Sequence, residues 1–107
     1  MIKNTKSALA KLEKKRLLAQ WSEAVKIRDC YNCQICHVTT HLNSHHILAK
    51  YNYKEYALDI KNGICICVSC HIFGKKSFHK NGIWASAWLQ KNRPELYELA
   101  LSRVKEV

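Results

Sequence analysis

The sequence predicts a single α+β domain. A short metal-stabilised core (residues 30–80) lies between a basic N-terminal helix (residues 1–29) and C-terminal helices (residues 81–107). Three observations predict this class. The chain has 107 residues, which is the size of one domain. Helical periodicity occupies the two ends, without repeats or a convincing linker. The stretch between the ends combines a short β-branched run with two Cys-x2-Cys pairs, a combination typical of a small metal-binding core.

The N-terminal segment, from residue 3 to about residue 29, has the pattern of one helix. Leu9 and Leu12, and then Leu17, Trp21 and Val25, recur at steps of three and four residues. The segment contains neither Gly nor Pro, the two residues that most often interrupt a helix. We therefore expect an amphipathic helix with this apolar stripe toward the core.

The same helix is strongly basic, with Lys14, Lys15 and Arg16 in one run. A solvated helix face explains any single lysine, whereas a helix that follows the DNA backbone explains the group as a whole. We expect these three residues to contact nucleic acid.

The core segment predicts a β-hairpin followed by a helix. Residues 44–47 predict a first short strand and residues 48–62 a loop. The pair Asn62-Gly63 is a strong turn signal, and the β-branched run of residues 64–66 predicts a second strand. From Cys67 onward we expect a helix that carries Cys67 and Cys70 and ends or bends at Gly74.

The C-terminal segment predicts two helices. Residues 82–92 place Trp84 and Trp88 one turn apart, and we expect both rings, like that of Trp21, in the core. Pro94 stands where a last helix begins, because proline is favoured in the first helical turn. Leu96 is the first residue of the apolar face of that helix.

The charge of the chain indicates a polyanionic partner. It has 18 Lys and Arg against 8 Asp and Glu, a net charge of +10 with neutral histidines. Nucleic acid is the first candidate for such a partner and an acidic membrane surface the second. No apolar run approaches the roughly 18 residues of a membrane span, and a Lys-rich stretch follows Met1 where a secretory signal would be apolar. We expect a soluble, cytoplasmic protein that does not enter the membrane.

Four cysteines have the spacing of a structural zinc site. Cys33-x2-Cys36 and Cys67-x2-Cys70 bracket a gap of 30 residues, and two such pairs make a closed tetrahedral thiolate site for Zn²⁺. Four thiolates leave no open coordination position for water, so this zinc is expected to stabilise the fold rather than to catalyse. Two chance pairs of buried cysteines are the alternative.

The other two cysteines, Cys30 and Cys65, lie outside these pairs and are expected to be small buried hydrophobes. Cys30 could also replace a neighbouring zinc ligand, although its spacing is poorer.

Three histidines are not needed by a four-cysteine zinc. His45 and His46 are adjacent in the predicted strand, so their side chains project to opposite sides. His71 follows Cys70 and is rotated by about 100° from it on a helix, and therefore points to a different site. One histidine of the pair can hold a metal while the other acts elsewhere. His37 and His41, in the turn after the first pair, are expected to be ordinary surface residues.

These motifs together carry a resemblance. The string Cys33-x2-Cys36, Ser44-His45-His46-Ile47, Asn62-Gly63-Ile64, Cys65-Ile66-Cys67-x2-Cys70-His71 resembles the zinc-bearing HNH endonucleases over about residues 28–80. The flanking helices resemble phage-encoded HNH proteins, including the NinG recombination proteins. The resemblance implies a treble-clef-like ββα-metal core, in which a hairpin carries the histidine pair and a following helix carries the last histidine.

The resemblance also implies a role for each matching residue. His45 and His71 would be ligands of a catalytic divalent cation, Mg²⁺ or Mn²⁺. His46 would be the general base that deprotonates the attacking water. Asn62 would hydrogen-bond across the hairpin and hold the His46 loop in place. His79 is a candidate for a further histidine found in many members, but seven residues separate it from His71, whereas members with His-x3-His place that residue closer.

The residue types suit hydrolysis of a phosphodiester. A neutral imidazole with an ordinary pKa of about 6.5 can act as a base at neutral pH, and one cation can stabilise charge on the phosphate and on the leaving oxygen. Between residues 30 and 94 only Glu55 and Asp59 are acidic, which argues against a two-metal carboxylate nuclease. The nearby basic residues Lys75, Lys76 and Lys80 are expected to meet phosphates.

The sequence therefore favours an HNH-type DNA endonuclease, and the resemblance implies that it leaves 5′-phosphate and 3′-hydroxyl ends. A homodimer stays open, since one such centre cuts one strand at a time and cleavage of both strands would suggest two copies. A phage or host protein partner also stays open. The first alternative is a non-catalytic zinc-knuckle DNA-binding protein, which would not need His45, His46 and His71. The second is a nuclease toxin with an immunity partner, against which the missing delivery domain argues.

Overall fold

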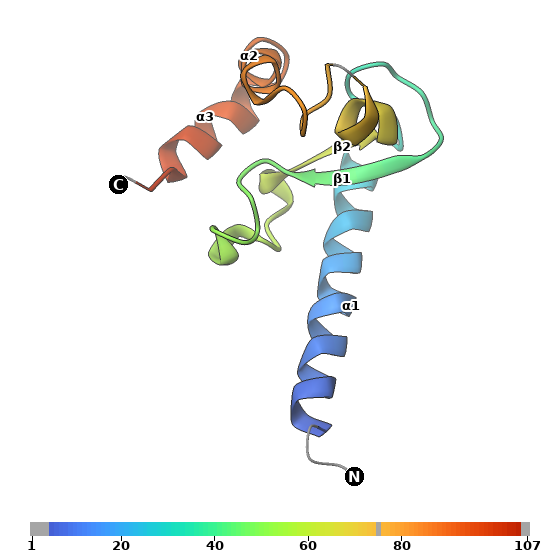
Figure 1. Ribbon diagram of the computed structural model, residues 1–107, viewed down its shortest axis with the longest axis vertical. Coiled ribbons are helices and arrows are strands. Elements are labelled where there is room, and N and C mark those ends of the chain that lie inside the picture. The colour runs from blue at the N-terminus through green and yellow to red at the C-terminus, as the bar shows by residue number, and fades with distance from the viewer. Residues whose placement is uncertain (1–4, 75, 106–107) are drawn as a thin grey trace.

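The computed structural model describes residues 5–74 and 76–105, and these form a mixed α+β domain with one two-stranded sheet (Figure 1). The α+β class is thereby confirmed. The elements in chain order are α1 (Thr5–Arg28), β1 (Leu42–His46), the 3₁₀ turns η1 (Lys54–Tyr56) and η2 (Ile60–Asn62), β2 (Gly63–Cys67), the π-helical turn η3 (Ser69–Phe73), α2 (Gly82–Asn92) and α3 (Pro94–Arg103). In the described part of the chain, no helix is both long and apolar enough to cross a membrane.

The sheet is an antiparallel pair of strands at the centre of the domain. Leu42 of β1 lies opposite Cys67 of β2, and His46 lies opposite Gly63. Every residue of β2 is buried, because α1 covers one face of the strand and α2 with Phe78 covers the other. The predicted second strand is confirmed, and the loop of residues 47–62 connects the two strands.

Gly63 allows α1 to approach the sheet closely. A Cβ atom at this position would lie 2.6 Å from the ring of Trp21 and 2.6 Å from a methyl group of Val25, both of which are buried on α1. A side chain at residue 63 would therefore push the helix away from the strand.

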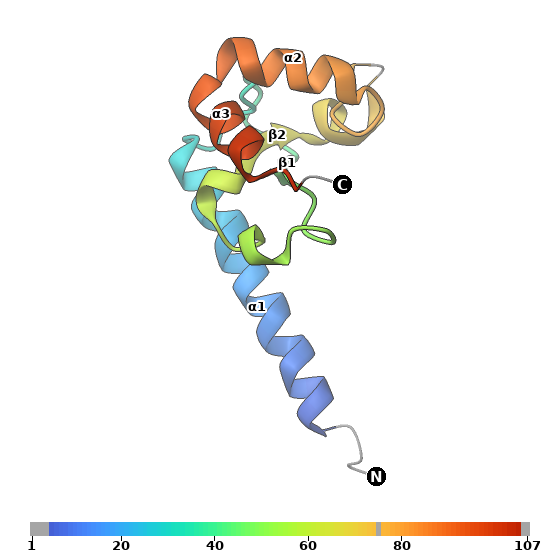
Figure 2. The same ribbon diagram turned by 90° about the vertical axis from the view of Figure 1, so that its left-hand side faces the viewer.

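Helix α1 packs only through its C-terminal part. Trp21 and Val25 are its buried residues, whereas Leu9 and Leu12 of the predicted apolar stripe are 59% and 63% exposed. The N-terminal half projects away from the sheet and from the other helices in both views (Figures 1 and 2). The predicted helix is confirmed, but its apolar stripe meets the core only at its end.

The segment after the second strand differs from the expected helix. Cys67 is the last residue of β2, and only Cys70 lies on a helical turn, the five-residue η3. Pairing with Leu42 keeps Cys67 in the strand, and the backbone turns helical only from Val68 (φ −58°, ψ −35°), whose N–H donates to the His41 carbonyl (2.9 Å). As predicted, η3 ends at Gly74, whose N–H donates to the Ser69 carbonyl.

The C-terminal helices occupy the predicted ranges. The Asn81 side chain accepts from the Trp84 N–H and caps α2 (3.0 Å), and Pro94 opens α3. Helix α2 buries Ala85 and Leu89. Trp84 and Trp88 are half-buried at the edge of the core rather than in its centre.

A buried carboxylate joins three parts of the fold. Asp29, just after α1, is 6% exposed. It accepts from Arg28, from Arg93 between α2 and α3, and from the backbone N–H of Cys65 in β2. Burial alone would raise the pKa of Asp29, but these donors hold that pKa below its usual value. Asp29 thus stays ionised and fixes the helix ends to the sheet.

Candidate metal centres

The four predicted cysteines form one cluster. The sulfur atoms of Cys33, Cys36, Cys67 and Cys70 all lie within 4.8 Å of one another, and those of Cys36 and Cys67 are 3.5 Å apart. A tetrahedral zinc with Zn–S bonds of about 2.3 Å places its sulfurs about 3.8 Å apart. The cluster could therefore hold a metal ion such as zinc.

A tight turn presents the first cysteine pair. The Cys33 N–H donates to Val38 and its carbonyl accepts from His37 (2.9 Å), while the Cys36 N–H points to the Cys33 sulfur at 3.4 Å. Burial alone would raise the pKa of Cys33, but backbone N–H groups such as that of Cys36 lower it to about 7. This sulfur is thus prepared to act as a thiolate ligand.

The two remaining cysteines differ from each other. Cys65 is fully buried on β2, and burial raises the pKa of its thiol to about 11, so its predicted role as a small hydrophobe is confirmed. Cys30 is exposed, and its predicted burial is wrong. It lies in the turn that leaves α1 with a φ of 57°, which directs the chain away from the core at this residue.

The structure also brings three histidines together. Ring nitrogens of His45, His71 and His79 lie within 4.8 Å of one another, and the Nε2 atoms of His71 and His79 are 2.8 Å apart. The chain returns to His71 at His79, because the His79 N–H donates to the His71 carbonyl (3.0 Å). His79 is therefore brought to the cluster despite its distance in sequence.

His45 and His71 are held in the neutral state. Burial, followed by the nearby His71 and His79, lowers the pKa of His45 to about 3. Burial and His79 lower the pKa of His71 to about 4. Neutral imidazoles with free lone pairs are the form that binds a metal ion. The cluster includes no carboxylate among the described residues, so a divalent cation there would keep its full charge.

Asn43 supports the cluster from the same strand. Its side-chain amide lies 3.3 Å from Nδ1 of His71, which leaves Nε2 of that ring facing His79. A hydrogen bond to the far nitrogen of a histidine ligand orients the ring and selects its tautomer. The polar turn of residues 39–43 contained no pattern that marked Asn43 for this contact.

His46 projects to the opposite face of β1, as predicted for adjacent strand residues. Its ring stacks on Trp21 with centroids 3.8 Å apart and planes 6° from parallel. Its Nε2 lies 2.9 Å from the Ala57 carbonyl, so Nε2 carries the proton and Nδ1 has the free lone pair. Burial lowers the pKa of His46, which favours a neutral ring that can accept a proton.

Asn62 holds the long loop after His46. Its Oδ1 accepts from the Leu48 N–H (2.8 Å), and its Nδ2 donates to the carbonyls of Leu48 (3.0 Å) and Tyr56 (3.2 Å). The side chain is 2% exposed. Asn62 therefore links the two ends of the loop that follows His46. Hydrogen bonds across this loop are the contacts that the resemblance implied for Asn62.

One open groove contains all four histidines. It has a volume of about 450 Å³ and is lined by His45, His46, His71 and His79, with Trp21 of α1 and Lys50 and Tyr51 of the loop among its other residues. The groove size is in the usual range for ligand sites, about 300–1,000 Å³. The two faces of β1 thus contribute to the same depression in the surface.

The predicted DNA contacts are arranged around the domain. Lys14, Lys15 and Arg16 are exposed on α1, where Arg16 pairs with Glu13. Lys76 and Lys80 are exposed in the segment that leads to and follows His79. Lys75 lies outside the described residues.

No protein-family model, curated protein or solved structure matches the chain.

Proposed function

We propose that this protein is a metal-dependent endonuclease of the HNH type that hydrolyses phosphodiester bonds of DNA. The observation that carries the proposal is the division of labour between two adjacent residues of β1. His45 joins a cluster of three imidazoles, while His46, on the other face, has a free Nδ1 and lines the same groove. In this proposal the hairpin, η3 and the two metal sites constitute a ββα-metal core.

The residues act as follows in the proposed reaction. Nδ1 of His46 takes a proton from a water molecule in the groove, and the oxygen of that water attacks the phosphorus atom. The bond from phosphorus to the 3′ oxygen breaks, and this oxygen leaves with the bonding electron pair and takes a proton from solvent water, which gives a 5′-phosphate and a 3′-hydroxyl. Stacking on Trp21 and the Ala57 carbonyl keep the His46 ring in one orientation and one tautomer throughout.

His45, His71 and His79 would hold the catalytic cation. A divalent cation supplies Lewis-acid stabilisation of charge on the phosphate and on the leaving oxygen. The donor set bears on its identity, because imidazole suits transition metals, whereas Mg²⁺ prefers oxygen ligands. Of the two cations predicted from the sequence, Mn²⁺ fits three imidazoles better than Mg²⁺ does.

The four-cysteine cluster has a different role in this proposal. Four thiolates satisfy a tetrahedral Zn²⁺ without an open position, so this ion connects the turn after α1 to the end of β2 and takes no part in the reaction. A zinc of this kind replaces apolar packing that a short chain cannot supply.

The test is conversion of supercoiled plasmid DNA to nicked DNA by the purified zinc-loaded protein. The assay compares no added cation, Mg²⁺, Mn²⁺, Co²⁺ and Ni²⁺. We expect nicking to require an added cation and to be faster with Mn²⁺ than with Mg²⁺. A folded, zinc-containing protein that binds DNA but cuts it with none of these cations would overturn the proposal. It would favour the alternative of a non-catalytic zinc-knuckle DNA-binding protein, for which the four cysteines and the net charge suffice.

A further inference from the structure

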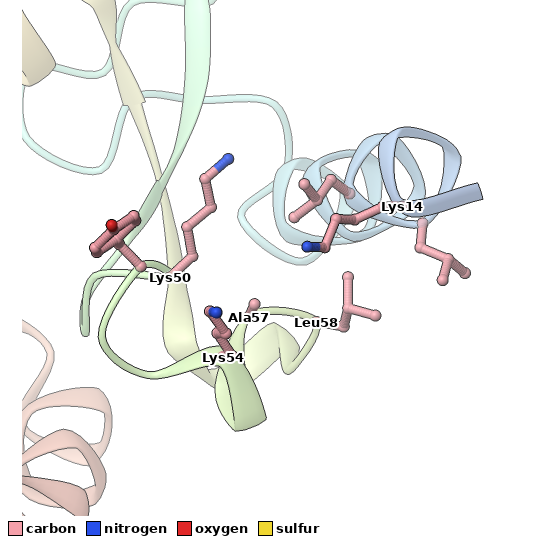
Figure 3. Close-up of a pocket in the computed structure, with 8 residues that line it drawn as sticks. Lys14, Lys50, Lys54, Ala57 and Leu58 are labelled. Carbon is pink, nitrogen blue, oxygen red and sulfur yellow. The ribbon is translucent and has the colours of Figure 1, made fainter. Parts of the chain in front are cut away.

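A second pocket lies beside the histidine groove, between α1 and the loop after β1. Its volume is about 380 Å³, which is sufficient for a small organic ligand. It shares Leu18, Lys50 and Tyr51 with the histidine groove. Figure 3 shows Lys14 extending from α1 toward the loop, where Lys54, Ala57 and Leu58 lie opposite it. The two depressions are therefore continuous along the surface.

The rim of this pocket is positively charged. Lys14 comes from α1, Lys50 from the loop and Lys54 from η1, and no acidic residue lines the pocket. Within the described residues, none of the three lysines forms an ion pair. Three unneutralised ammonium groups around one pocket attract a phosphate-containing ligand.

The floor of the pocket is apolar and has one aromatic ring at its edge. Leu17 and Leu18 of α1 face Leu58 of the loop across it. Tyr51 is 84% exposed, which is unusual for a tyrosine that only packs against the core. Positive charge combined with apolar and aromatic surface is the pattern of sites that bind single-stranded nucleic acid, since bases stack on rings while phosphates meet lysines.

The pocket is also directly connected to the proposed base. The carbonyl that holds His46 belongs to Ala57, which lines the pocket. A nucleotide in the pocket would thus be a near neighbour of a phosphate in the histidine groove. A base paired within a duplex faces its partner strand and cannot enter such a pocket, whereas an unpaired base can.

We propose that this pocket (Lys14, Lys50, Lys54, Leu58, Tyr51) binds one unpaired nucleotide of the DNA strand that occupies the histidine groove. The inference rests on the proposed function, because DNA in the groove determines which ligand reaches the pocket. It adds a substrate preference: DNA with unpaired nucleotides next to the cleavage position, such as a gap, a flap or a junction of single and double strands, binds better than a continuous duplex.

The test measures equilibrium binding without cleavage. The zinc-loaded His46→Ala variant is titrated into two fluorescent DNAs of the same sequence, a continuous duplex and a duplex with a short single-stranded gap. We expect the gapped DNA to bind about tenfold more tightly, the gain typical of stacking one base on an aromatic ring. Tyr51→Ala and Lys54→Glu should remove most of this preference. Lys91→Glu, an exposed lysine on α2, makes the same charge change away from both depressions and should retain the preference.

A second readout locates the nucleotide. A photoreactive thymidine analogue in the gap should cross-link to the pocket, and the modified peptide should contain Tyr51 or a residue close to it. Equal affinity for both DNAs, or an equal effect of Lys91→Glu and Lys54→Glu on the preference, would overturn the inference. Plasmid nicking by the wild-type protein separates the two proposals. Nicking without a gap preference refutes the pocket alone, whereas a gap preference without nicking refutes the nuclease and supports the pocket.

Discussion

Replacement of Asn62 by alanine should both destabilise the domain and impair the site. The side chain makes three hydrogen bonds to the backbone of Leu48 and Tyr56 and is 2% exposed. Each such bond contributes about 0.5–1.5 kcal/mol net, so Asn62→Ala should lower the free energy of unfolding by about 2–4 kcal/mol. For a domain of this size that corresponds to a fall in Tm of about 10–20 °C.

The effect on the proposed reaction has a separate origin. Asn62 closes the loop that contains Ala57, whose carbonyl holds the His46 ring. A loosened loop lets that ring rotate, and a displacement of about 1 Å at a reacting group costs up to about 100-fold in rate. Plasmid nicking should be measured well below the Tm of the variant, so that the loss does not reflect unfolding.

Two further variants sharpen this prediction. Asn62→Asp keeps the acceptor for the Leu48 N–H but loses both donations to carbonyls, and it should be no more stable than Asn62→Ala. Asn52→Ala is the matched control, because Asn52 is exposed in the same loop and makes its hydrogen bonds through its backbone: its N–H donates to the Ala49 carbonyl, and its carbonyl accepts from Lys105. If the Tm of Asn62→Ala lay within a few degrees of that of Asn52→Ala, the three hydrogen bonds of Asn62 would not stabilise the fold as predicted.

Three other predictions concern the zinc site, the cation site and the buried carboxylate. Elemental analysis should find about one tightly bound zinc per chain. Cys33→Ser should lose both zinc and fold, whereas Cys30→Ser, outside the cluster and exposed, should keep both; a Cys33→Ser variant that keeps its zinc would contradict the assignment of Cys33 as a ligand. His71→Ala should weaken Mn²⁺ binding in calorimetric titrations at least tenfold relative to a control at the exposed His41, and unchanged binding would exclude His71 as a ligand. Asp29→Asn should cost about 2–3 kcal/mol in urea unfolding at neutral pH, because both arginines keep some exposure to water. The lowered pKa of Asp29 means that its contribution is complete above the ordinary pKa of about 3.8 and is lost as the pH falls through the lower folded-state value. The stability difference between wild type and Asp29→Asn should therefore shrink in acid, and a constant difference down to pH 2 would contradict this.

Much of the fold follows from local patterns that the sequence makes visible. Helix α2 begins and ends at the predicted residues, since its apolar period and its Asn81 cap are both local signals. The second strand was predictable because a short β-branched run follows an Asn-Gly turn signal. The cysteine pairs were predictable because zinc ligation imposes a fixed spacing.

Other features depend on contacts between distant segments and have no local signal. The burial of Asp29 depends on Arg93, which lies 64 residues later. The approach of His79 to His71 depends on two backbone hydrogen bonds that close their loop, Phe78 N–H to Cys70 and His79 N–H to His71. Backbone bonds of this kind place no restriction on side-chain type, so spacing alone left His79 in doubt.

The helix predicted from Cys67 begins later and is shorter than expected for a related reason. The pattern from Cys67 to His71 fits a helical spacing, but pairing with β1 keeps Cys67 in β2, and only Cys70 of the pair lies on the helical turn η3. Tertiary pairing decided the conformation where the local signal was only four or five residues long.

In the proposed mechanism, His46 acts as a base beside a cation held by His45, His71 and His79. The most direct test compares plasmid nicking by His46→Ala and His41→Ala under saturating Mn²⁺, with zinc content and Tm measured for both. His41 is an exposed histidine outside the groove. We expect a rate at least about 100-fold lower for His46→Ala, an unchanged rate for His41→Ala, and a full complement of zinc in each. Nicking by His46→Ala at the wild-type rate would contradict this mechanism.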